Sequence, residues 1–110
     1  MLRQEEILRQ IDLIYRRVQY EKQSKQYETR DLVIAFNEGG IDGFDFALGH
    51  NEQEIVACYE SGFPSGLEGK GIDMCYEVGK KIALEAVLGK RELLHMIEES
   101  FGSKNRGGDL

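Results

Sequence analysis

The chain has 110 residues, with 14 Lys and Arg against 20 Asp and Glu, and its formal net charge at pH 7 is −6. This length suits one domain that folds without a metal or a disulfide, and the 41% hydrophobic content excludes a wholly disordered chain. The longest unbroken apolar run covers residues 32–36, which is far too short to cross a bilayer. We therefore expect one domain over residues 1–102, followed by a flexible tail at residues 103–110.

The first residues and the cysteines indicate a cytoplasmic protein. Residues 1–6 contain charged and amide side chains where a secretory signal would have an apolar stretch. A chain with only two cysteines, Cys58 and Cys75, more often keeps reduced thiols than a disulfide framework.

An amphipathic helix is predicted over residues 3–18, with residues 19–29 prolonging it as a more exposed arm. Arg, Gln and Glu occupy one face of this helix. The other face carries an apolar stripe at helical spacing: Ile7, Ile11, Ile14 and Val18. Because the stripe is wider than one short partner helix covers, we expect these four side chains to form a homodimer interface.

The middle of the chain is predicted to form an antiparallel β-hairpin or meander. Residues 32–36 are a short apolar run, and the Asn-Glu-Gly-Gly sequence at residues 37–40 is a turn signal. After this turn, Phe44, Phe46 and Leu48 alternate with polar or small residues, as in a strand with one buried face.

The segment from residue 51 to 62 fits either a helix or a third strand. The composition between Ile55 and Tyr59 is typical of a strand. Asn51 is followed three residues later by Glu54, however, and this spacing is that of a capping box at the start of a helix. We favour the helix, and the strand stays open.

A second amphipathic helix closes the predicted fold. Its apolar face carries four residues: Cys75, Val78, Ile82 and Ala86. Its glycines allow two interpretations: the close approach of another backbone at Gly79, or a helix end at Gly89 followed by a short helix over residues 90–100. We favour a break or kink near Gly89. The predicted fold class is α+β, with a hairpin between two helices, and an all-α fold is the alternative.

Charge is unevenly distributed along the chain. Residues 1–30 carry a net charge of +2, residues 70–110 are neutral, and residues 31–69 contain eight acids without one Lys or Arg. An acidic region of this kind attracts a basic partner and raises its association rate. We expect six of the acids to contact the partner: Glu38, Asp42, Asp45, Glu52, Glu54 and Glu60.

These features favour a small acidic, non-enzymatic protein that binds a protein partner with a basic surface. A more specific hypothesis is an inhibitor of a nucleic-acid-handling enzyme, of the phage or mobile-element anti-defence type, and it rests on size and charge. Direct binding to nucleic acid is not expected, because the acids of the middle region repel phosphate.

A helix-turn-helix regulator is the first alternative. Residues 47–49 (Ala-Leu-Gly), followed by residues 51–62, resemble the helix-turn-helix of phage-repressor-like regulators, with a Leu-Gly turn, a recognition helix and a Glu-x-Gly closure. The resemblance implies a small transcriptional regulator. Phosphate contacts would then come from five basic residues near the N-terminus: Arg16, Arg17, Lys22, Lys25 and Arg30.

A small enzyme or a metal-binding protein is the second alternative. Zinc-ligand side chains occur at His50, Cys58, Cys75 and His95. Their spacings lack the close pairs that structural zinc sites use, and the residues around Asp42 and Asp45 lack the calcium-loop pattern. We expect no catalytic residue, no cofactor and no metal site.

Overall fold

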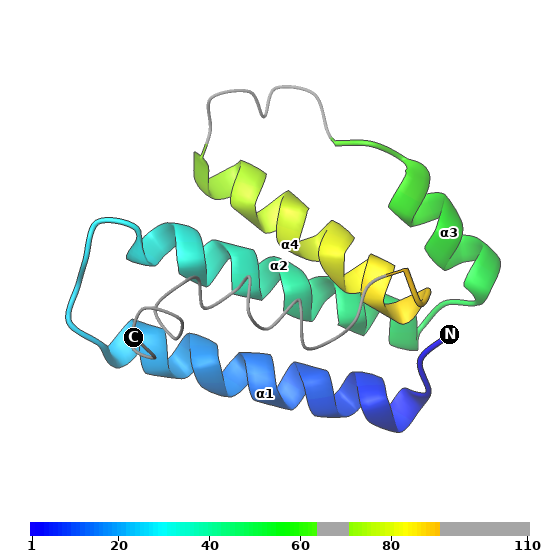
Figure 1. Ribbon diagram of the computed structural model, residues 1–110, viewed down its shortest axis with the longest axis horizontal. Helices are drawn as coiled ribbons and strands as arrows, with labels where there is room; N and C mark the ends of the chain where they lie inside the picture. The colour runs from blue at the N-terminus through cyan, green and yellow to red at the C-terminus, as the bar shows by residue number, and fades with distance from the viewer. Residues whose placement is uncertain (64–70, 91–110) are drawn as a thin grey trace, which may run out of the picture.

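The computed structural model describes residues 1–63 and 71–90 (Figure 1). The helices in these ranges are α1 (Gln4–Gln23), α2 (Arg30–Leu48), α3 (Glu52–Glu60) and α4 (Gly71–Val87). Central α2 makes its most extensive contacts with α4 and packs against α1, while the short α3 contacts α4 and α2 (Figure 1). None of these four helices is long and apolar enough to cross a bilayer.

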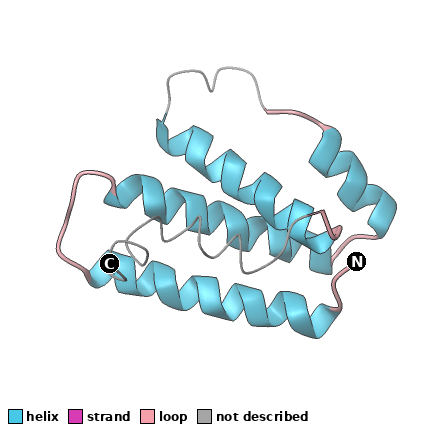
Figure 2. Ribbon diagram, viewed as in Figure 1, coloured by secondary structure: helices cyan, strands magenta, loops and turns pink. Residues whose placement is uncertain are grey.

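The prediction of an α+β fold is wrong. Figure 2 shows helices and loops but no strand in the described ranges, so the all-α alternative applies there. The predicted hairpin, residues 32–48, lies within the single helix α2, which continues through Gly39 and Gly40. Both glycines are buried, so they lie at a helix contact, where packing outweighs their preference for turns.

Glycines allow α2 and α4 to cross with their backbones in direct contact. A Cβ added to Gly39 would overlap the carbonyl oxygen of Tyr76, and a Cβ on Gly79 would overlap a carbonyl oxygen of α2. One turn further along α2, a Cβ on Gly43 would lie 2.7 Å from the carbonyl oxygen of Lys80. Small residues permit such close helix crossings. The close approach of another backbone at Gly79, the less favoured of the two interpretations, is therefore present in the structure.

The helix end predicted near Gly89 is confirmed, whereas the helix predicted to follow it is not tested. Helix α4 ends at Val87, and Gly89 has a φ of 81°, in the left-handed region where helices commonly end. Residues 91–100 of the predicted short helix, the tail at residues 103–110 and the domain boundary between them lie outside the described residues.

Helix α1 is longer than the packed segment predicted for it. It continues to Gln23, so only the first part of the expected arm at residues 19–29 is helical. Ile7, Ile14 and Val18 are buried in the core of the same chain, as the apolar stripe of an amphipathic helix requires.

Helix α3 is the predicted capping-box helix. The Asn51 side-chain oxygen accepts a hydrogen bond from the Glu54 backbone at 2.9 Å, and the Glu54 carboxylate accepts one from the Asn51 backbone at 2.9 Å. Ile55 is fully buried, and the Tyr59 hydroxyl donates to Glu85 of α4 at 2.7 Å. These contacts fasten the short helix to the core.

Replacing Asn51 by alanine should lower the free energy of unfolding by about 1 kcal/mol, because the Glu54 backbone N–H loses its acceptor. Thermal unfolding followed by circular dichroism measures the change. Asn51→Asp keeps an acceptor oxygen at the same place and should retain most of the stability. Equal losses in the two variants would contradict a stabilising cap at this residue.

Candidate functional site

A groove of about 320 Å³ is bounded by α1, α2 and α4. Eight residues line it: Tyr15, Val18, Gln19 and Lys22 of α1, Glu38, Ile41 and Asp42 of α2, and Tyr76 of α4. Each member from α1 or α2 has another member three or four positions away on the same helix, so each set forms one stripe on its helix. The groove thus combines two tyrosines and two aliphatic side chains with two carboxylates and one ammonium group.

Both carboxylates of the groove already have a partner. The Lys22 ammonium lies 3.3 Å from the Glu38 carboxylate, and both side chains are about half exposed, at 48% and 45%. One turn further along α2, Asp42 accepts a hydrogen bond from the Tyr76 hydroxyl. The first contact joins α1 to α2, and the second joins α2 to α4.

The groove around Tyr76 is electrostatically negative. Burial raises the pKa of Tyr76 to about 12, and the hydrogen bond and negative charge of Asp42 act in the same direction. The negative charges of Glu77 and Glu38 add to this effect. Three carboxylates therefore act on one phenol, which stays protonated and donates its hydrogen bond at neutral pH.

Alkaline titration should show that the phenols of Tyr76 and Tyr27 ionise near pH 12 in the folded protein. Burial and the hydrogen bond to Glu21, in that order of size, raise the pKa of Tyr27 to about 12 as well. In an unfolded chain, tyrosines ionise near pH 10. Between these pH values the folded state holds protons that the unfolded state loses, so the free energy of unfolding falls as the pH rises.

Ultraviolet absorbance measures this titration, and Tyr76→Phe should remove one of the late steps. Asp42→Asn should lower the pKa of Tyr76 only in part, because burial is its largest cause. Ionisation of every tyrosine in a single step near pH 10 would contradict the contacts described for Tyr76 and Tyr27.

The groove contains two of the six acids predicted to bind a partner, Glu38 and Asp42. Asp45 is exposed on α2, seven residues after Glu38 and three after Asp42. This spacing places it on the same stripe of the helix, beyond the residues that line the groove.

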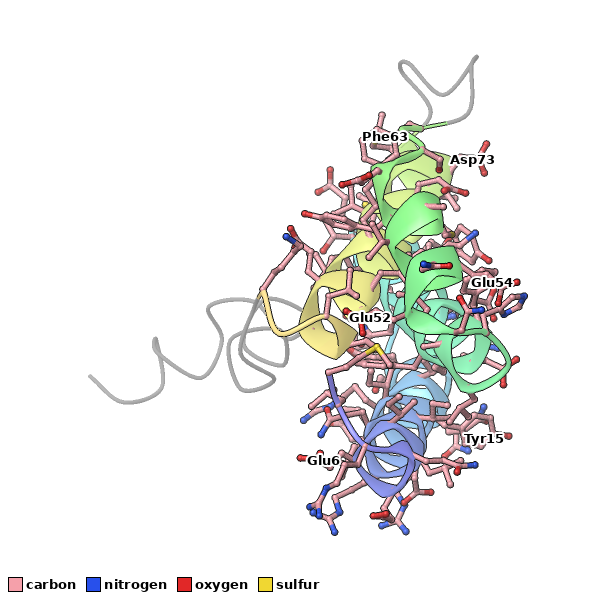
Figure 3. The ribbon with its side chains drawn as sticks, turned by 90° about the vertical axis from the view of Figure 1, so that its right-hand side faces the viewer. Glu6, Tyr15, Glu52, Glu54, Phe63 and Asp73 are labelled. Carbon is pink, nitrogen blue, oxygen red and sulfur yellow. The ribbon has the colours of Figure 1, made fainter. Side chains whose placement is uncertain are left out.

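The acids of α3 and α4 extend this negatively charged surface. Figure 3 shows Glu54 of α3 and Asp73 of α4 pointing to the same side of the molecule as Tyr15. Glu52 and Glu60 are exposed at the two ends of α3 and do not line the groove. We use the term acidic face for one set of residues: Glu38, Asp42, Asp45, Glu54 and Asp73.

The four residues predicted to form a dimer interface lie toward the core of their own chain. Ile7, Ile14 and Val18 are buried, and Ile11 is partly buried against the same core. The homodimer stays a prediction. The hydrophobic side chains of α1 that are exposed are others: Leu8, Leu13, Tyr15 and Tyr20.

The segment that resembles a helix-turn-helix has the corresponding helices. Helix α2 ends at Leu48, residues 49–51 form the connection, and α3 begins at Glu52. The exposed side chains of α3 are those of Glu52, Gln53, Glu54, Ala57 and Glu60. Where a recognition helix would meet DNA, α3 therefore presents three carboxylates and no basic side chain.

The three zinc-ligand residues that the structure describes, His50, Cys58 and Cys75, are not gathered at one place. The His50 ring stacks on Phe46 at 3.8 Å between ring centroids, and its Nδ1 lies 2.7 Å from the Phe46 carbonyl oxygen. Cys58 and Cys75 are partly buried on different helices, and His95 lies outside the described residues. Among the residues that the structure describes, no three His, Cys, Asp or Glu are grouped so that they could hold a metal ion.

Sequence reasoning did not assign Tyr15, Lys22, Asp73 or Tyr76 to the site. Tyr15 and Lys22 are seven residues apart on α1, a spacing that places them on one face beside the apolar stripe. This is the one local signal that points to the groove. Tyr76 reaches Asp42 across 34 residues of chain, and only the crossing of α2 and α4 brings them together.

No family model, no curated protein and no solved structure matches this chain. The groove and the acidic face are therefore the features from which a function is argued.

Proposed function

We propose that this protein acts without catalysis, in the cytoplasm, by binding a protein partner with a basic surface. The observation that carries the proposal is the groove, in which two tyrosines lie beside the carboxylates of Glu38 and Asp42. Buried aromatic side chains provide much of the affinity of protein interfaces, and surrounding charges steer the encounter. The other acids of the acidic face would supply this steering.

A nucleic-acid-binding cleft is one basic surface that such a face fits. Its Lys and Arg side chains bind phosphates, and carboxylates held on helices compete for the same side chains. The specific form of the proposal is therefore an inhibitor that occupies the cleft of a nucleic-acid-handling enzyme. It is supported by the size of the chain and by its charge.

A transcriptional regulator is the second candidate, because α2, the short connection and α3 follow one another as in a helix-turn-helix. The carboxylates of α3 oppose it. A salt-titrated binding assay on duplex DNA separates the two functions. Tight, salt-sensitive binding that is abolished by Arg16→Glu with Arg17→Glu would support the regulator and contradict our proposal.

The proposal is tested by affinity capture from a cytoplasmic lysate at low and at high salt, followed by measurements with the purified partner. The series neutralises four acids in turn, as Asn or Gln: Asp42, Asp45, Glu52 and Glu54. Each step at a residue of the acidic face, which means Asp42, Asp45 and Glu54, should weaken binding about two- to five-fold. The amides keep the side-chain size, and Glu54→Gln keeps the acceptor of the capping box. Unchanged affinity across the series would overturn the proposal.

A further inference from the structure

We propose that the groove receives an arginine side chain of the partner, and that Lys22 competes for the same place in the free protein. This inference rests on the proposed binding function and names the group that the site recognises.

The two carboxylates suit a guanidinium group. Glu38 and Asp42 are four residues apart on α2, so they are neighbours on one stripe of the helix. Each carboxylate has two oxygens and about four acceptor positions, so one bond from Tyr76 or Lys22 leaves Asp42 and Glu38 with further capacity. A guanidinium offers five N–H donors in a planar fork, whereas an ammonium is a compact point charge.

The remaining lining suits the rest of an arginine side chain. Tyr15 is 54% exposed, and Tyr76 is partly buried on the other side of the groove. Guanidinium groups stack on aromatic faces more often than ammonium groups do. Val18 and Ile41 provide aliphatic surface on which the methylene stem can lie.

Lys22 is the cation that the groove holds in the free protein. The side chains of Lys22 and Glu38 are each about half exposed, and exposed ion pairs of this kind contribute little to stability. A guanidinium that bonds Glu38 and Asp42 together can therefore displace it. Removing the Lys22 charge should then tighten the binding of arginine.

The test titrates the full chain with octa-arginine and with octa-lysine, two peptides of equal length and charge, and measures affinity by calorimetry. We expect octa-arginine to bind at least about five-fold more tightly. Glu38→Gln with Asp42→Asn should weaken it about ten-fold or more. Glu5→Gln with Glu28→Gln removes the same charge from exposed positions outside the groove and should weaken it no more than about three-fold.

The second arm compares two lysine variants that change the net charge equally. Lys22→Gln should tighten octa-arginine binding about three-fold or more, whereas Lys25→Gln, at an exposed position outside the groove, should change it by less than about two-fold. Circular dichroism checks that each variant is folded.

Equal affinity for the two peptides, equal effects of the two acid pairs, or equal effects of the two lysine variants would overturn the arginine site. Each of these results would leave general binding by the acidic face intact. Failure of octa-arginine to bind would also overturn the arginine site. The proposed function is judged separately, by the purified partner and the series that includes Asp45 and Glu54.

Discussion

Replacing Gly79 by alanine should destabilise the fold by about 3 kcal/mol or more, because the new methyl group overlaps a carbonyl oxygen of α2. The overlapping atom belongs to a helix backbone, so no flexible side chain can move aside and the two helices must separate along their contact. In an exposed helix the same change would instead stabilise by about 1 kcal/mol. Urea unfolding followed by circular dichroism measures the effect, and Gly39→Ala should behave alike.

Two other glycines serve as controls for this prediction. Gly49 has a φ of −101°, and the nearest atom to an added Cβ is the Phe46 carbonyl oxygen at 3.9 Å. Gly49→Ala should therefore leave stability unchanged or raise it by up to about 1 kcal/mol. Gly89 has a φ of 81°, and no atom of the described residues other than its chain neighbours lies within 4 Å of an added Cβ, so Gly89→Ala should cost about 1 kcal/mol through backbone strain. Unchanged stability of Gly79→Ala would contradict the backbone contact.

Replacing Phe44 by alanine should lower the free energy of unfolding by about 3–5 kcal/mol, because this fully buried ring would leave a cavity in the core. Phe46 is only partly buried and stacks on His50, so Phe46→Ala should cost clearly less. In a strand the two rings would share one face and cost similar amounts, whereas in a helix they point in different directions.

The same urea unfolding measurement compares these variants. Phe63→Ala is the control for loss of a ring from an exposed position, since Phe63 is 45% exposed, and it should have a small effect. Equal costs for Phe44→Ala and Phe46→Ala would contradict the helical arrangement of this segment.

The elements that sequence reasoning predicted correctly are those with a local physical signal. The stripe from Ile7 to Val18 repeats at helical spacing, and this periodicity follows from the geometry of one helix. The cap at Asn51 depends on residues three positions apart, and the helix end at Gly89 depends on one φ angle. Each can be recognised without knowing what packs against it.

Helix α2 could not be predicted in this way, because the cause of its stability lies elsewhere in the chain. A Gly-Gly pair after an apolar run is a strong turn signal by itself. Here Gly39 contacts the backbone of Tyr76 and Lys80, and this close packing requires a glycine inside a helix. The alternation of Phe44 and Phe46 added a second local signal for a strand, and tertiary packing outweighed it.

In the candidate site, too, the features with a local signal could be predicted, and those that depend on tertiary packing could not. The uneven distribution of charge led to Glu38 and Asp42, because the absence of Lys and Arg from residues 31–69 is visible in the sequence. The groove itself needs Tyr15 from α1 and Tyr76 from α4, and their meeting depends on how three helices pack. A surface charge can be predicted from local composition, whereas a groove requires the fold.

The continuity of α2 is the central claim, since it places Glu38, Asp42 and Asp45 on one stripe and brings α4 against Gly39. Backbone ¹³Cα chemical shifts of residues 30–48 test it most directly. We expect helical shifts without interruption from residue 31 to 47, together with nuclear Overhauser effects between Gly39 and Tyr76. Strand-like shifts on both sides of a turn at residues 39–40 would contradict the fold and the site built on it.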